Sequence, residues 1–242
     1  VLAAKALALA PLPRGRTVGI LAPSGAMAVC MTDLCERELN LTVPDLQEKT
    51  RIRLQAMSPP FIRMRNPVDI WPSATIHGAE KAYRDAMEAV LMDAHVDALV
   101  GILMMTDETG APPLDFILDL AHRFPEKPIY VSCSGQKKHM EAAKAFLEPG
   151  GVPTFWFAEE AFEALHFAVQ CRQAMERTMK LDAFGGTRTK EEQKIVATLT
   201  PPRYRSSLTQ RAIPQRTSTA AFSACSGSAG RFNASPPPSG AR

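Results

Sequence analysis

The sequence lacks the marks of secreted, membrane-spanning and metal-binding proteins. Its five cysteines are odd in number and have no C-x-x-C spacing, which favours reduced thiols in a cytoplasmic protein over a disulfide framework or a zinc site. No stretch approaches the ~20 consecutive apolar residues of a membrane span. The five histidines show no metal-binding spacing. We therefore expect a cytoplasmic location, with no membrane contact and no metal site.

Acidic residues are absent from the last part of the chain. Residues 206–242 contain no Asp or Glu and are rich in Ser, Ala, Arg and Pro. Residues 181–242 contain nine Lys or Arg and three Asp or Glu. Such a segment cannot bury enough apolar surface to offset its ordering entropy, which predicts a disordered basic tail over residues 181–242. Its charges are scattered without interleaved aromatic residues, so we expect no nucleic-acid partner.

The preceding part of the chain alternates short apolar runs with helical patterns. The apolar runs, which predict strands, are residues 17–22, 41–43, 96–104, 127–132 and 152–157. The helical patterns are residues 26–39, 45–57, 79–92, 113–123, 136–147 and 158–180. Strands that alternate with helices predict a parallel sheet with right-handed crossovers. We expect an α/β fold: a flavodoxin-like, doubly wound, five-stranded parallel sheet.

Composition divides the chain into three regions. Residues 1–15 read as a connector helix followed by a linker, because Pro and Gly end the helical pattern. Residues 16–180 form the predicted flavodoxin-like domain, and residues 181–242 form the tail. The first residue is Val, inside a helical pattern, so we expect a piece of a longer polypeptide.

The loops that follow the strands are the candidate binding positions, because ligands of doubly wound sheets bind beyond the carboxyl ends of the strands. Ser24, Gly25 and Ala26 follow the first strand and open a helix, whose N–H groups and dipole attract anions. We predict that they lie near a phosphate or another anion. A plain tight turn is the alternative.

A second candidate anion position is Thr106, which follows the strand predicted over residues 96–104. Asp107 and Glu108 come next, so a helix-capping role for this loop is the alternative.

The tetrapeptide Asn66-Pro67-Val68-Asp69 is the third candidate. Pro67 fixes its own backbone and pushes Asn66 to an extended conformation, while Asn and Asp side chains can hold neighbouring backbone groups. We predict that Asn66, Pro67 and Asp69 shape a cleft between domains. The alternative is a rigid loop whose polar side chains satisfy buried amides.

The fourth candidate follows the strand over residues 127–132, where Ser134 and Gly135 are predicted to line the same cleft. Cys133 precedes them, beside a helix start with lysines nearby. Two interpretations remain open: an activated nucleophile, or a buried and inert thiol.

The order of these motifs resembles a known family. A strand-turn-helix over residues 17–26 is followed by Leu-Thr-Val-Pro-Asp-Leu at residues 41–46, a charged helix, and Pro59-Pro60-Phe61 and Arg65 ahead of Asn66-Pro67-Val68-Asp69. This order resembles the last flavodoxin-like domain in the CoA-ligase part of the NDP-forming acyl-CoA synthetases, relatives of succinyl-CoA synthetase. The resemblance covers residues 1–178.

The resemblance implies a fragment or subunit of an enzyme that joins an acid to CoA at the expense of a nucleoside triphosphate. In the family, helix N-termini stabilise a phosphohistidine, and that histidine lies in a Ser-His-Thr-Gly segment that this sequence does not contain. The resemblance therefore implies no catalytic residue here and no activity of the chain alone. It implies CoA, a nucleotide and Mg²⁺ for the whole enzyme, with CoA-binding and ATP-grasp domains or subunits as partners.

Two alternatives stay open. One is a regulatory, synthetase-like domain of a protein lysine acetyltransferase. The other is a stand-alone flavodoxin-like module that binds a flavin or nucleotide.

Overall fold

The computed structural model describes residues 1–105 and 113–183, with side chains up to residue 178. The chain divides into a compact unit, Val1–Thr187, and the remainder, Arg188–Arg242. All described residues belong to the first unit. The predicted tail over residues 181–242 lies almost wholly outside the described residues, and the three predicted regions stay a prediction.

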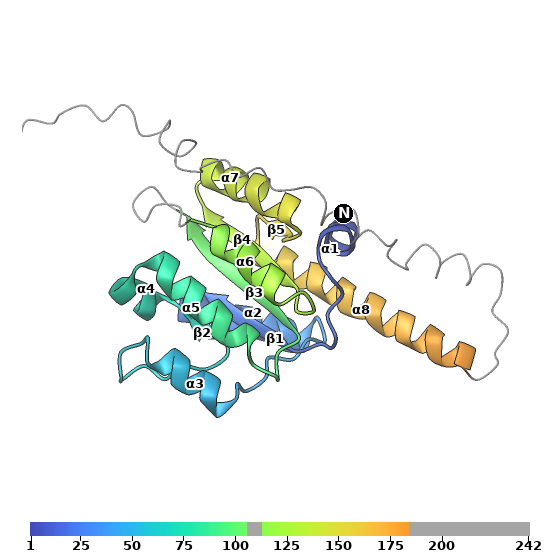
Figure 1. Cartoon of the computed structure of the whole chain (residues 1–242), viewed down its shortest axis with the longest axis horizontal. Coiled ribbons are helices and arrows are strands. Elements are labelled where there is room, and N and C mark those ends of the chain that lie inside the picture. Colours follow the sequence, from blue (N-terminus) through green and yellow to red (C-terminus); the bar gives the residue numbers. More distant parts are fainter. Residues whose placement is uncertain (106–112, 184–242) are drawn as a thin grey trace, which may run out of the picture. The chain divides into compact units, whose positions relative to one another are not determined.

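A five-stranded parallel sheet forms the centre of the compact unit (Figure 1). Its strands are β1 (Val18–Ala22), β2 (Val68–Asp69), β3 (Ala98–Met105), β4 (Ile129–Gly135) and β5 (Thr154–Phe155). They lie in the order β2-β1-β3-β4-β5, with every neighbouring pair parallel. This order is that of the flavodoxin-like fold. Successive strands are added on one side of β1 and then, from β3 onward, on its other side, so the topological switch point lies between β1 and β3. The predicted fold class is confirmed.

Helices cover both faces of the sheet (Figure 1). The helices are α1 (Leu2–Leu9), α2 (Gly25–Arg37), α3 (Glu48–Gln55), α4 (Trp71–His77), α5 (Ala79–Leu91), α6 (Asp115–Arg123), α7 (Lys137–Leu147) and α8 (Ala158–Ala183), with a 3₁₀ turn, η1 (Glu148–Gly150), after α7. None of these helices is long and apolar enough to cross a membrane.

Side-chain alternation along β3 builds two hydrophobic cores. Leu99 and Leu103 face a core that includes buried residues of α5, α6 and α7. Val100 and Ile102 face the opposite core, which includes buried residues of α1, α2 and α8. Because both faces of β3 are buried, the strand reads as a nearly continuous apolar run.

One predicted strand is misplaced. Residues 41–43 form only an isolated bridge, in which Thr42 pairs with Thr17. The second strand is instead β2, within the Asn-Pro-Val-Asp tetrapeptide, where Leu21 pairs with Val68 and Ala22 with Asp69. A strand of two residues gives no periodic pattern, so the longer apolar run was the misleading signal.

Candidate functional site

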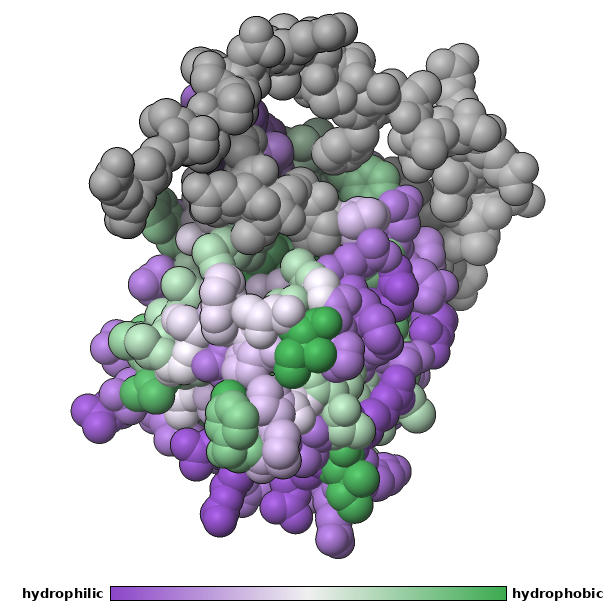
Figure 2. Space-filling model, turned by 90° about the vertical axis from the view of Figure 1, so that its left-hand side faces the viewer, coloured by the Kyte–Doolittle hydropathy of each residue, from purple (hydrophilic) through white to green (hydrophobic). Residues whose placement is uncertain are grey.

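The carboxyl ends of the strands gather on one side of the molecule, the left in Figure 1 and the side facing the viewer in Figure 2. Ser24 follows β1 here and caps α2: its Oγ accepts a hydrogen bond from the Met27 N–H at 3.3 Å. Ser24, Gly25 and Ala26 are all exposed. The predicted strand-turn-helix is therefore present, with exposed residues at the start of the helix. Whether an anion binds there stays a prediction.

Asp69 lies beside this helix start, because β2 pairs with β1. Its Oδ2 is 3.3 Å from the position that a Cβ on Gly25 would take. Its Oδ1 accepts a hydrogen bond from the Trp71 N–H at 3.1 Å. The carboxylate thus stands near the positive end of the α2 dipole, where negative charge is favourable. An external anion at this position would share it with Asp69.

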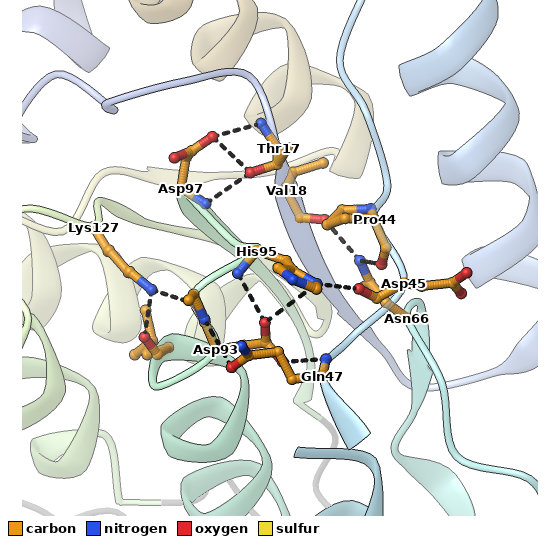
Figure 3. Close-up of polar contacts among 12 residues, drawn as sticks. Thr17, Val18, Pro44, Asp45, Gln47, Asn66, Asp93, His95, Asp97 and Lys127 are labelled. Carbon is orange, nitrogen blue, oxygen red and sulfur yellow. Dashed lines mark hydrogen bonds and ion pairs between the residues drawn. The ribbon is translucent and has the colours of Figure 1, made fainter. Parts of the chain in front are cut away.

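Asn66 holds three backbone groups with one side chain, and Figure 3 shows its contacts with Val18 and Pro44. Its Oδ1 accepts a hydrogen bond from the Ile20 N–H at 2.9 Å, and its Nδ2 donates to the carbonyls of Val18 at 2.9 Å and Pro44 at 3.1 Å. The Asn66–Pro67 peptide bond is cis. The buried amide therefore extends the pairing of β1 beyond β2 and joins the loop before α3 to the sheet. Its predicted role in shaping an inter-domain cleft stays a prediction.

Ser134 and Gly135 are exposed at the end of β4, in register with Met104 and Met105 of β3. Gly135 has φ of +140°, and a Cβ there would lie 2.0 Å from the Met105 carbonyl oxygen. Only glycine allows β3 and β4 to stay paired to this point, where the Gln136 N–H also donates to the Met105 carbonyl at 3.0 Å.

The Cys133 thiol is buried in the core, and burial raises its pKa to about 12. The thiol is therefore buried, as the second interpretation expects, and its inertness stays a prediction. Thr106, Asp107 and Glu108 lie outside the described residues.

The structure thus brings together two of the predicted sets. The loop over Ser24, Gly25 and Ala26 meets Asp69 at the ends of β1 and β2. Ser134 and Gly135 lie two strands away, beside the end of β3. Among the described residues, no group of three His, Cys, Asp or Glu side chains could hold a metal ion.

A polar cluster at the amino ends of the strands, opposite the candidate site, was not predicted (Figure 3). Asp93 is fully buried and accepts hydrogen bonds from the N–H groups of Gln47 at 2.8 Å and His95 at 2.9 Å. Burial acts to raise the pKa of Asp93, but these bonds and one from Thr50 outweigh it and hold the pKa below its usual value. The Lys127 ammonium donates to the carbonyl of Asp93 at 2.6 Å.

These residues lie far from one another in sequence, and only the folded chain brings them together. Because they stand at the amino ends of the strands, we assign them to stability rather than to ligand binding.

A cavity of about 270 Å³ opens at the carboxyl ends of the strands. Its lining residues are Pro23, Ile70, Trp71, Ala74, Thr75, Ala79, Tyr83 and Met104. They come from the loop after β1, from α4 with the residue before it, from α5 and from β3. Sequence reasoning missed this cavity because α4 was not predicted. A proline at the start of α4, Pro72, was the available signal.

The strand order defines a flavodoxin-like domain, and comparisons with known proteins show what the chain is similar to. No family model matches the chain. The chain is 31% identical over 152 residues to acetate–CoA ligase [ADP-forming] II of Archaeoglobus fulgidus, a match that covers 62% of this chain and 22% of the relative. It is also 31% identical over 171 residues to the alpha subunit of acetate–CoA ligase [ADP-forming] II of Pyrococcus furiosus, covering 66% of this chain and 35% of that subunit.

Solved structures agree. PH0766 from Pyrococcus horikoshii matches 68% of the chain and 38% of its own length, at 27% identity and a TM-score of 0.58. The dinucleotide forming acetyl-coenzyme A synthetase 1 of Ca. Korarchaeum cryptofilum has the same fold over 74% of the chain and 38% of its own, at 23% identity and a TM-score of 0.63. The two curated relatives are ADP-forming acetate–CoA ligases, and the chain resembles a flavodoxin-like CoA-ligase domain of the NDP-forming acyl-CoA synthetases. It spans 22% to 35% of the length of the two curated relatives.

Proposed function

We propose that this chain is a domain or subunit of an NDP-forming acyl-CoA synthetase, which converts an acid, CoA and a nucleoside triphosphate into acyl-CoA, nucleoside diphosphate and phosphate. The observation that carries the proposal is the match to two ADP-forming acetate–CoA ligases across the domain. The same match favours a ligase over the regulatory domain of a lysine acetyltransferase and over a stand-alone nucleotide-binding module. We place the enzyme in the cytoplasm.

In this proposal the domain supplies helix N-termini and an interface near the phosphohistidine site, while the histidine belongs to another domain. The start of α2 supports this role, because Ser24, Gly25 and Ala26 are exposed at the carboxyl end of β1. Asp69 next to it would orient a neighbouring N–H or hydroxyl group rather than bind phosphate directly. We assign CoA, the nucleotide and Mg²⁺ to CoA-binding and ATP-grasp partners.

Reconstitution tests the proposal. Acyl-CoA formation is measured with this chain alone, with a candidate CoA-binding and ATP-grasp partner alone, and with the mixture. We expect turnover only in the mixture, because the chain contains no Ser-His-Thr-Gly segment. Turnover by the isolated chain would contradict the proposal that its catalytic histidine lies elsewhere. A mixture as slow as the partner alone would contradict the assignment to this enzyme.

A further inference from the structure

The cavity beside α4 has an apolar interior. Tyr83 is buried at its base, and the Tyr83 hydroxyl already donates a hydrogen bond to the Ile102 carbonyl at 2.8 Å. Thr75 likewise donates its hydroxyl to the Pro72 carbonyl at 2.8 Å. The two side-chain hydroxyls of the lining are therefore engaged within the domain, and what remains available to an occupant is chiefly hydrocarbon and aromatic surface.

Size limits what the cavity can hold. Its volume of about 270 Å³ is below the roughly 300–1,000 Å³ of pockets that enclose a small-molecule ligand. A single aliphatic or aromatic side chain fits this space better than a cofactor does. The dimensions favour an anchor residue of a protein partner.

The surroundings of the cavity have the anatomy of a protein interface. Trp71 lines the cavity yet is 50% exposed, and Ile76, later on α4, is 56% exposed. Figure 2 shows pale green, near-white and pale purple residues in the middle of this side of the molecule, and stronger purple along its right-hand and lower margins. An exposed aromatic residue at an apolar pocket is typical of an interaction hot spot.

Asp69 adds a charge preference. It directly precedes Ile70 and Trp71 of the cavity wall, and its Oδ1 is occupied by the Trp71 N–H. Its Oδ2 accepts no hydrogen bond from the described residues, which leaves one carboxylate oxygen for an outside donor. A cationic side chain complements this oxygen, whereas an acidic one is repelled.

We propose that the cavity is an anchor pocket for a segment of another domain or subunit of the same enzyme. That segment inserts an aliphatic side chain against Trp71 and places a neighbouring Lys or Arg beside Asp69. The inference rests on the proposed function, because the curated relatives are about three to five times longer than their matched regions and so have further parts to dock.

Trp71 fluorescence provides the test. In a full-length Trp156→Phe chain, Trp71 is the remaining tryptophan, and its emission is followed while N-acetyl-Leu-Arg-amide is added. We expect a saturable change with a dissociation constant on the order of 10 mM, as suits a single anchor. N-acetyl-Leu-Glu-amide should bind at least about fivefold more weakly, and N-acetyl-Gly-Arg-amide should give no saturable change.

Two variants separate the anchor from the charge. Ala74→Leu fills the cavity and should abolish the response to N-acetyl-Leu-Arg-amide. Asp69→Asn keeps an oxygen for the Trp71 N–H and should reduce the Arg-over-Glu preference to less than about twofold. Circular dichroism verifies that both variants are folded, and a misfolded Ala74→Leu leaves the decision to Asp69→Asn and the three peptides.

Equal responses to all three peptides, or none, would overturn the anchor pocket. The same change with CoA or ADP at about 1 mM would also overturn it, and would indicate a small-molecule site. If ligase activity is reconstituted but Trp71 fluorescence does not respond to the peptides, only this inference is contradicted. If the fluorescence responds but no ligase activity is reconstituted, the proposed function is contradicted instead.

Discussion

Gly19 lies where α5 crosses the sheet. A Cβ there would lie 2.3 Å from Cγ1 of Val90 and 3.3 Å from side-chain atoms of Leu99 and Val96. Val90 is β-branched and stiff at χ1, so it cannot turn aside. At Gly101 of β3, by contrast, the one close atom is Cε of Met87 at 2.3 Å, the far end of a flexible side chain.

Gly19→Ala should therefore lower the free energy of unfolding by about 2–3 kcal/mol, and Gly101→Ala by less than about 1.5 kcal/mol. Urea denaturation of the two variants side by side measures the difference. Each adds one methyl group to the same sheet, so Gly101→Ala is the matched control. Equal losses in the free energy of unfolding would show that the whole helix α5 shifts to admit the methyl group, rather than single side chains of α5.

Asp93 makes the folding stability of the domain sensitive to acid. Its pKa is held below the usual value, so its contribution is present above the ordinary pKa, near 4, and is lost as the pH falls through the depressed pKa. We expect Asp93→Asn to be less stable at pH 7 and to lose less stability between pH 5 and pH 3. Urea midpoints at three pH values test this, and parallel pH profiles for the two proteins would contradict it.

At the scale of elements, the strands over residues 17–22, 96–104 and 127–132 were predictable because each is a long apolar run buried on both faces. The position of β2 was not, because its two residues carry no period. Its place depends on Asn66, whose side-chain amide forms hydrogen bonds with the backbone of β1. Asn66 and β1 are too far apart in sequence for one local pattern to contain both. The meeting of Gly25 with Asp69 was unpredictable for the same reason, since it requires the pairing of β1 with β2.

Asn66→Ala should destabilise the domain by about 3 kcal/mol, because it leaves the buried Ile20 N–H and Val18 carbonyl without their side-chain partner. Denaturant unfolding measures the loss. Asn66→Asp is the matched control: it keeps an acceptor for Ile20 but sets a carboxylate against two carbonyls. Its pKa should rise, so this variant should gain stability relative to the parent as the pH falls from 7 to 5. A constant difference across that range would argue against this geometry.

At the scale of the whole molecule, the described unit has its own two-sided core. Because the sequence predicts a disordered tail, a stop codon after Thr187 should leave the melting temperature of the domain unchanged within about 2 °C. Thermal unfolding of the two lengths decides this. A larger drop would show that residues 188–242 contribute to the fold.

Both outer strands of the sheet, β2 and β5, are only two residues long. Next to β5, the Lys5 ammonium of α1 donates to the Thr154 carbonyl, which occupies part of that edge. Long open edges recruit strands from other molecules, and short or capped edges give them no template. The short and capped edges therefore protect the domain against edge-to-edge aggregation, a property that suits the proposed docking through the cavity beside α4 rather than through the sheet.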